Sequence, residues 1–289
     1  MRLRTIWIFG IIAAVGACSS DRAYVPPGTV LTDAQVSADV AGTAGMAAAT
    51  SLEEQGNFLG DIGISPSLNS FGHILPAPDR QPPSASATQQ ARPVCAFNAK
   101  TGTWNCAPLV NSKGQTLLMS YAYFDASGAA TQEYNGTTTE KVVYNSQLDG
   151  PVGDGTTMTG MTHRRQEQIL TGLTGKEVTR TWNGAGRSAD TTDYHTASVS
   201  RHYVGAEVDS IKNVIYAQPR VPGTYPLSGE IVRVANYTAS AIGKANESRS
   251  VSRRVLTTFN GTANVTIKSG TVTCTLHLDT KKVDGCVPN

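Results

Sequence analysis

Two acidic residues separated by one position, Glu207 and Asp209, are the side chains in this sequence best spaced for acid–base chemistry. On a β-strand, residues two apart point to the same side and lie roughly 6.6 Å apart, close to the separation of paired glycosidase carboxylates. The spacing therefore permits a carboxylate-dependent hydrolase acting on envelope or extracellular glycans. Gly205 precedes the pair, and acids that follow a glycine are also typical of a solvated turn.

Metal chemistry has weaker support. His195 and His202 lie near Asp190 and Asp193, but on one continuous strand the two histidines would point to opposite faces. The sequence contains no CxxC, HExxH, P-loop, GxGxxG or GxSxG pattern. We therefore predict no metal site, no cofactor and no assignable catalytic residue, which favours a non-enzymatic role and leaves enzymatic activity open.

Strands must position these side chains, because from about residue 94 onward Thr, Val, Tyr, Ser and Asn alternate with a period of two. The alternation is clearest from Arg254 to Lys268. The other candidate strands are Gln115–Phe124, Thr138–Tyr144, Arg165–Gly172, Glu177–Trp182, Thr192–Val204, Lys212–Gln218 and Gly229–Tyr237. We predict an all-β fold, an antiparallel β-sandwich, with an open or closed antiparallel barrel as the alternative.

Four cysteines of this β region form two close pairs, Cys95 with Cys106 and Cys274 with Cys286. Four cysteines allow three connectivities. Turn-forming residues lie between the members of each pair, and directly opposed residues of a hairpin are close enough for a disulfide. Local pairing is therefore favoured over the alternatives, and a zinc site is disfavoured because the sequence has no CxxC spacing.

The N-terminus carries Arg2 and Arg4, then an apolar run from Ile6 to Val15, then Gly16 and Ala17 before Cys18. This layout is typical of a secretory signal peptide and is too short to span a bilayer as a helix. The residues from Val15 to Cys18 resemble the lipobox of bacterial lipoproteins. The resemblance implies cleavage before Cys18, acylation of that residue with palmitate-type chains and anchoring to the cell envelope. Because serine rather than aspartate follows the cysteine, it points to the outer membrane, periplasmic or surface-exposed.

Three segments follow from this layout: a signal peptide at 1–17, a lipidated low-complexity tether at 18–93 and an antiparallel β domain at 94–289. The tether is rich in Ala, Ser, Pro, Gly and Gln and has few large apolar residues, so by itself it cannot form a core. One part of it is predicted to be helical, because Thr32 and Gln35 have capping-box spacing and alanines continue to Ala49.

Charge and aromatic content limit the partners of the chain. Its 24 basic and 22 acidic residues give a net charge of +2, which argues against a nucleic-acid surface. A basic run at Arg249, Arg253 and Arg254 could contact anionic headgroups or glycans. Aromatic side chains could form a sugar-stacking platform; they are Trp104, Trp182, Tyr194, Tyr203, Tyr216 and Tyr237. We therefore expect a membrane-anchored envelope lipoprotein whose β domain binds an envelope protein or a glycan, or has a structural role.

Overall fold

The computed structural model describes residues 31–61, 94–111, 113–196, 200–218, 223–242 and 247–289. Within them one helix, α1 (Asp33–Asp61), precedes fourteen strands. The strands are β1 (Cys95–Asn98), β2 (Thr103–Cys106), β3 (Leu109–Val110), β4 (Thr116–Asp125), β5 (Ala130–Thr131), β6 (Thr139–Gly153), β7 (Met158–Thr171), β8 (Thr179–His195), β9 (Ser200–Ala217), β10 (Ser228–Ile242), β11 (Ser248–Thr258), β12 (Asn264–Ser269), β13 (Val272–His277) and β14 (Lys282–Pro288).

All the strands belong to one antiparallel sheet, whose main path runs from β1 through β2, β4 and β6 to β14, with β3 and β5 paired to β4. Among the described strands, the two ends of this path do not pair with each other. The predicted all-β antiparallel class is confirmed. The single continuous sheet corresponds to the open alternative and not to two packed sheets.

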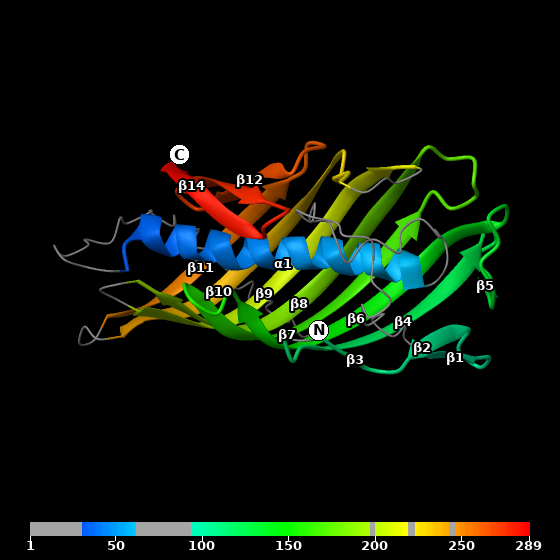
Figure 1. Cartoon of the computed structure of the whole chain (residues 1–289), viewed down its shortest axis with the longest axis horizontal. Helices are drawn as coiled ribbons and strands as arrows, with labels where there is room; N and C mark the ends of the chain where they lie inside the picture. Colours follow the sequence, from blue (N-terminus) through cyan, green and yellow to red (C-terminus); the bar gives the residue numbers. More distant parts are fainter. Residues whose placement is uncertain (1–30, 62–93, 112, 197–199, 219–222, 243–246) are drawn as a thin grey trace, which may run out of the picture.

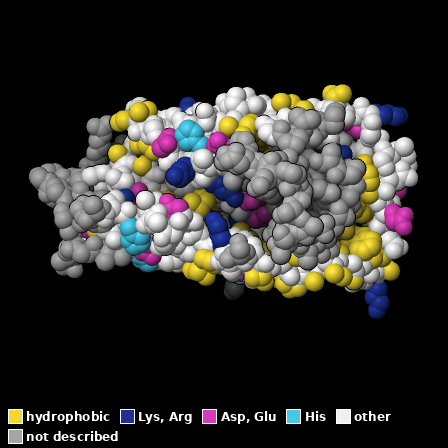
Figure 2. Space-filling view, in the orientation of Figure 1, with side chains coloured by type: hydrophobic (Ala, Val, Ile, Leu, Met, Phe, Trp, Pro, Cys, Tyr) yellow, Lys and Arg dark blue, Asp and Glu magenta, His cyan; other side chains and the backbone are white. Residues whose placement is uncertain are grey.

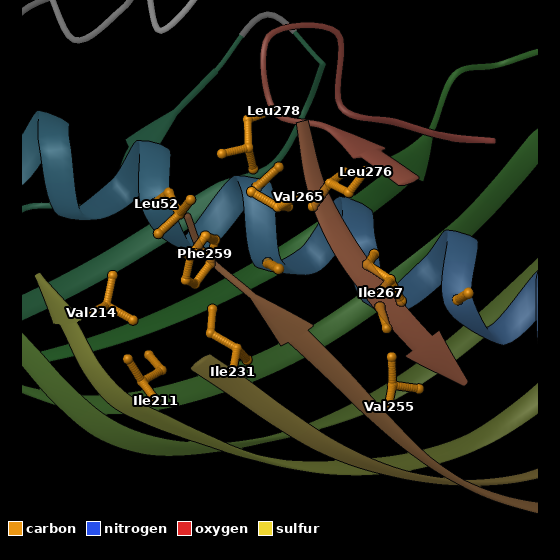
Figure 3. Packing of buried hydrophobic residues seen from close by; sticks show 14 of the residues in the cluster. Leu52, Ile211, Val214, Ile231, Val255, Phe259, Val265, Ile267, Leu276 and Leu278 are labelled. Carbon is orange, nitrogen blue, oxygen red and sulfur yellow. The ribbon is translucent and has the colours of Figure 1, made fainter. Parts of the chain in front are cut away.

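The sheet buries one face against α1, which lies across the strands in Figure 1. We call this the inner face, and the opposite face the outer face. Inner-face residues alternate with outer-face residues along β12 and β13, as the pleat requires. In Figure 3, Leu52 of α1 lies next to Phe259, which follows β11, with Val214 and Ile231 of the sheet below them; all four belong to one continuous apolar core.

Helix α1 begins where the sequence predicts, because the Thr32 hydroxyl accepts a hydrogen bond from the backbone N–H of Gln35 at 3.2 Å. It extends beyond the predicted end at Ala49, as far as Asp61. No helix among the described residues is both long and apolar enough to cross a membrane.

The prediction of a tether over 18–93 is wrong for the residues of α1. The tether prediction considered only the apolar surface that residues 18–93 could bury against one another. The small side chains of Ala41, Ala44 and Ala48 and the larger Leu52 and Phe58 instead bury against the sheet. The rest of the predicted tether lies outside the described residues, as do the signal peptide and Cys18.

Two predicted strands are each divided by a reversal of the chain. Residues 192–204 comprise the end of β8 and the start of β9, which pair as a hairpin with His195 opposite Ser200. Residues 254–268 comprise the end of β11 and most of β12. The alternation survives the second reversal, since Val255, Phe259 and Val265 are all buried. Periodicity alone therefore does not reveal the turn.

Both disulfides are formed with the local pairing that the hairpin argument favoured, Cys95–Cys106 and Cys274–Cys286. Cys95 lies directly opposite Cys106 in the β1–β2 ladder. Cys274 is buried in the core, whereas Cys286 lies exposed on β14. The second disulfide therefore ties the last strand of the sheet to the core.

Gly45 provides a test of how closely α1 approaches the sheet. A Cβ atom at this position would lie 2.4 Å from Cγ2 of Val283 and 2.8 Å from Cδ1 of Ile267. We expect Gly45→Val to lower the free energy of unfolding by about 1–3 kcal/mol, because the helix must move away from the sheet. Thermal and urea unfolding would measure this. Ala34→Val, at an exposed position of the same helix, is the control, with a loss below about 1 kcal/mol. Equal losses would contradict the packing.

Candidate functional site

Glu207 and Asp209 lie on the inner face of β9, beneath α1, and are 2% and 3% exposed. The expectation of a solvated turn is therefore wrong. The preceding Gly205 belongs to the same strand, where a Cβ atom would lie 2.6 Å from Cδ1 of Tyr237. This glycine makes room for the tyrosine ring and does not form a turn.

The two carboxylates share one cation from the neighbouring strand β10. Nη1 of Arg233 donates to Oε2 of Glu207 at 2.6 Å, and its Nη2 lies 4.0 Å from Oδ2 of Asp209. The hydroxyl of Tyr237 donates to Oε1 of Glu207 at 2.5 Å. With Asp190 nearby, three carboxyl groups surround one guanidinium.

The surplus of acidic groups determines the direction of the pKa shifts. Burial is the main reason that the pKa of Glu207 is raised, and the charges of Asp190 and Asp209 add to the effect against the attraction of Arg233. Burial alone would lower the pKa of Arg233, but the surrounding carboxylates raise it. The guanidinium therefore stays charged, and Glu207 is the carboxyl group in the cluster whose protonation is favoured.

A chain of side-chain hydrogen bonds connects this cluster with α1. Gln55 of the helix donates to Gln168 at 2.7 Å, Gln168 donates to Gln166 at 3.1 Å, and Gln166 donates to Asp209 at 2.7 Å. Ser51 of the helix also donates to Gln166, at 3.2 Å. Gly186 leaves space for this chain, because a Cβ atom there would lie 2.4 Å from Oδ1 of Asp209.

Ion pairs hold α1 along its length. Asp39 accepts hydrogen bonds from Arg201 Nε at 2.6 Å and Nη2 at 3.1 Å, and another from Tyr203 at 2.6 Å. Glu54 pairs with Arg164 in the buried interface. Three further pairs complete the set: Asp33 with Arg249, Asp33 with Arg253, and Glu53 with Lys281. In Figure 2, acidic and basic side chains lie next to each other near the middle of the face of the molecule that is shown.

The cluster of Glu207, Asp209 and Arg233 on the inner face is buried in the protein interior and is not an open site. The cavity between α1 and strands β6 to β10 has a volume of about 30 Å³, and its lining includes Thr50, Arg164, Asp190 and Arg233. This space accommodates about one water molecule and no organic substrate. Glu207 and Asp209 therefore belong to the buried polar network beneath α1.

The other candidate residues from the sequence, the histidines and the aromatic rings, are hydrogen-bonded to neighbouring side chains or mostly buried. Nδ1 of His202 lies 2.7 Å from Asp193, and Nδ1 of His195 lies 3.0 Å from the Ser200 hydroxyl. In the described part of the chain, no three His, Cys, Asp or Glu residues are arranged to hold a metal ion. Most rings of the predicted sugar platform are buried, namely Trp182, Tyr203, Tyr216 and Tyr237.

The outer face carries a concavity of a different kind, an open hollow of about 810 Å³ over strands β2 to β9. We call it the outer hollow. One row of directly paired residues crosses it, each on the next strand: Leu118, Gln147, Arg165, Arg187 and Val208. Leu118 and Val208 are 37% and 59% exposed, and both arginines are exposed.

Sequence analysis did not identify Arg165 and Arg187 as partners, because they are 22 positions apart and only the β7–β8 register brings them together. One signal was available. Arg164 and Arg165 are consecutive residues on a strand, so one of them must face inward and the other outward. The structure places Arg164 under the helix and Arg165 in the outer hollow.

The buried cluster predicts a strong coupling between Glu207 and Arg233. We expect Arg233→Met to cost about 3–5 kcal/mol of unfolding free energy, because it leaves buried carboxylates without their cation. Adding Glu207→Gln should recover about 1–3 kcal/mol relative to the sum of the single losses. Urea unfolding of the four proteins measures this cycle.

The exposed ion pair between Lys212 and Glu230 joins the same two strands and provides the control for this cycle. Lys212→Met should change the unfolding free energy by less than about 1 kcal/mol. Additive losses in the Glu207–Arg233 cycle would contradict the coupling.

Comparison with known proteins assigns no family: no family model, no curated protein and no solved structure matches this chain.

Proposed function

We propose that this chain is a lipoprotein of the cell envelope, anchored through Cys18, whose β domain is a non-enzymatic binding module. The proposed anchor rests on the basic, apolar and small-residue layout of positions 1–18. The two disulfides are consistent with an oxidising compartment outside the cytoplasm. Outer-membrane placement remains part of the proposal and rests on Ser19 following the cysteine.

The observation that carries the binding role is the outer hollow. Its volume is within the range of ligand sites, and it combines exposed apolar side chains, amide groups and charges. Leu118 and Val208 lie at opposite ends of the residue row, with Gln147, Arg165 and Arg187 between them. Because α1 packs on the inner face, the outer face is the side of the sheet that the described residues leave open to a partner.

The geometry gives no support to the alternative of a carboxylate-dependent hydrolase. A glycosidase needs one carboxylic acid and one carboxylate on either side of a bound sugar. Glu207 and Asp209 instead face the same buried arginine beneath a helix, in a space too small for a sugar. We therefore propose binding and not hydrolysis for the β domain.

The anchor predicts covalent acylation at one residue. In bacteria grown with an alkyne analogue of palmitate, the full chain should become labelled, and Cys18→Ser should abolish the label. Mass spectrometry of the N-terminal peptide should show a chain that begins at Cys18. Cys106→Ser, which removes a disulfide cysteine, is the control and should retain the label. An unprocessed terminus, or label that persists in Cys18→Ser, would refute the anchor.

The binding role predicts that the outer hollow lies next to a partner in the cell. A photo-crosslinking amino acid at Val208 should yield crosslinked species in intact cells. The same group at Val178, a 74% exposed valine before β8 and outside the hollow, should yield several-fold less. Gel mobility and mass spectrometry would identify the adducts. Equal yields from the two positions would exclude the hollow as the contact site.

A further inference from the structure

We propose that the outer hollow recognises a phosphate monoester group on an organic ligand, held between Arg165 and Arg187. This inference rests on the proposed binding function and specifies the chemistry of its ligand.

The two arginines are directly opposed residues on adjacent antiparallel strands, β7 and β8. Opposed residues of this kind have Cβ atoms about 4.5–5.5 Å apart, so their guanidinium groups can converge on one ligand. Neither group forms an ion pair or a hydrogen bond with another residue in the described part of the chain. On the inner face, Arg164, Arg201 and Arg233 contact carboxylates. The buried Arg180 is an exception, because its Nε and Nη1 atoms have no hydrogen-bond partner among the described residues.

Placing like charges directly opposite each other destabilises a sheet. An anion between the two guanidinium groups would remove this repulsion and satisfy donors that have no protein partner. Each guanidinium presents a planar pair of donors that matches two phosphate oxygens. Near neutral pH a phosphate monoester carries close to two negative charges, so it attracts two guanidinium groups more strongly than a single carboxylate, which carries one.

The remainder of the lining favours a phosphate that belongs to a larger molecule. Amide side chains of Asn105, Asn145 and Gln147 also line the hollow. Gln147 lies directly opposite Arg165, and its amide nitrogen donates to Asp149. Leu118 and Val208 provide apolar contact at either end of the row. A ligand with a phosphate group, neighbouring polar groups and an apolar portion matches this arrangement of charged, polar and apolar side chains.

Glu167 is the only acidic residue in the lining of the outer hollow. It lies on β7, two positions from Arg165 and on the same face, and it pairs in register with Ala185. Its charge opposes phosphate binding, so the lining keeps one net positive charge. Removing this charge should therefore strengthen binding, which a purely structural role of the arginines would not explain.

Calorimetric titration of the full acylated chain in neutral detergent micelles tests the proposal. The probes are glycerol 3-phosphate and, separately, mixed micelles that contain phosphatidic acid; glycerol and phosphatidylcholine are the neutral counterparts. We expect saturable binding of a phosphate probe and none of its neutral counterpart. Similar affinity for both phosphate probes indicates a soluble phosphate ester as the source, and clearly tighter binding of phosphatidic acid indicates a lipid headgroup.

Charge variants make the test specific. Arg165→Gln and Arg187→Gln should each weaken phosphate binding at least about tenfold, since each removes charge-assisted hydrogen bonds. Glu167→Gln should strengthen it several-fold. Arg254→Gln is the matched control: Arg254 is exposed at the far end of the same row, beyond Val208 and Val234, and outside the hollow. It should change affinity less than twofold.

Unfolding should not obscure the result, because removing one of two opposed like charges leaves the midpoint of thermal unfolding of Arg187→Gln unchanged or raised. No saturable binding of either phosphate probe, or equal weakening by Arg254→Gln, would overturn the phosphate assignment. If crosslinking at Val208 persists in that case, the binding function stands with another ligand. If the crosslinks are also absent, both proposals fail.

Discussion

The attraction between an acidic helix and a basic inner face determines the rest of this structure. Helix α1 contains no lysine or arginine, and each acidic residue whose side chain the structure describes pairs with a cation of the sheet. The pairs are Asp33 with Arg249 and Arg253, Asp39 with Arg201, Glu53 with Lys281, and Glu54 with Arg164. Buried pairs gain little in net stability, but losing one partner is costly. They therefore fix where the helix lies, and burial of its apolar side chains, among them Leu52 and Phe58, adds favourable free energy of docking.

This interaction also explains why the sequence revealed the fold class but not its details. The alternation of Val265 and Ile267 with exposed polar residues is that of a half-buried strand, and it predicted strands correctly. In β8 and β9 the inward positions include Ser188, Asp190 and Glu207, because those positions face polar groups of the interface and not an apolar core. A pattern based on hydrophobicity therefore ends these long strands too early.

The docking of α1 was not predictable from composition. Its small residues gave the impression of a segment unable to form a core, although small side chains are what allow a helix to approach a sheet closely. Gly45, which has no space for a side chain, shows this most directly. The local signal at Thr32 was sufficient to predict the start of the helix, because capping depends only on neighbouring residues. The surface that receives the helix is formed by strands far along the sequence.

The candidate site depends on the same separation of the two faces. Arg164 and Arg165 are neighbours in sequence and identical in chemistry, yet one is paired with Glu54 beneath the helix and the other is exposed in the outer hollow. Sequence alone assigns them to opposite faces, but it does not say which face is covered or that Arg187 lies opposite Arg165. Once α1 occupies the inner face, Arg164 and Arg201 of the sheet are paired with carboxylates of the helix. Among the described residues, Arg165 and Arg187 are left as opposed donors without a protein acceptor, which is the basis for proposing an anion between them.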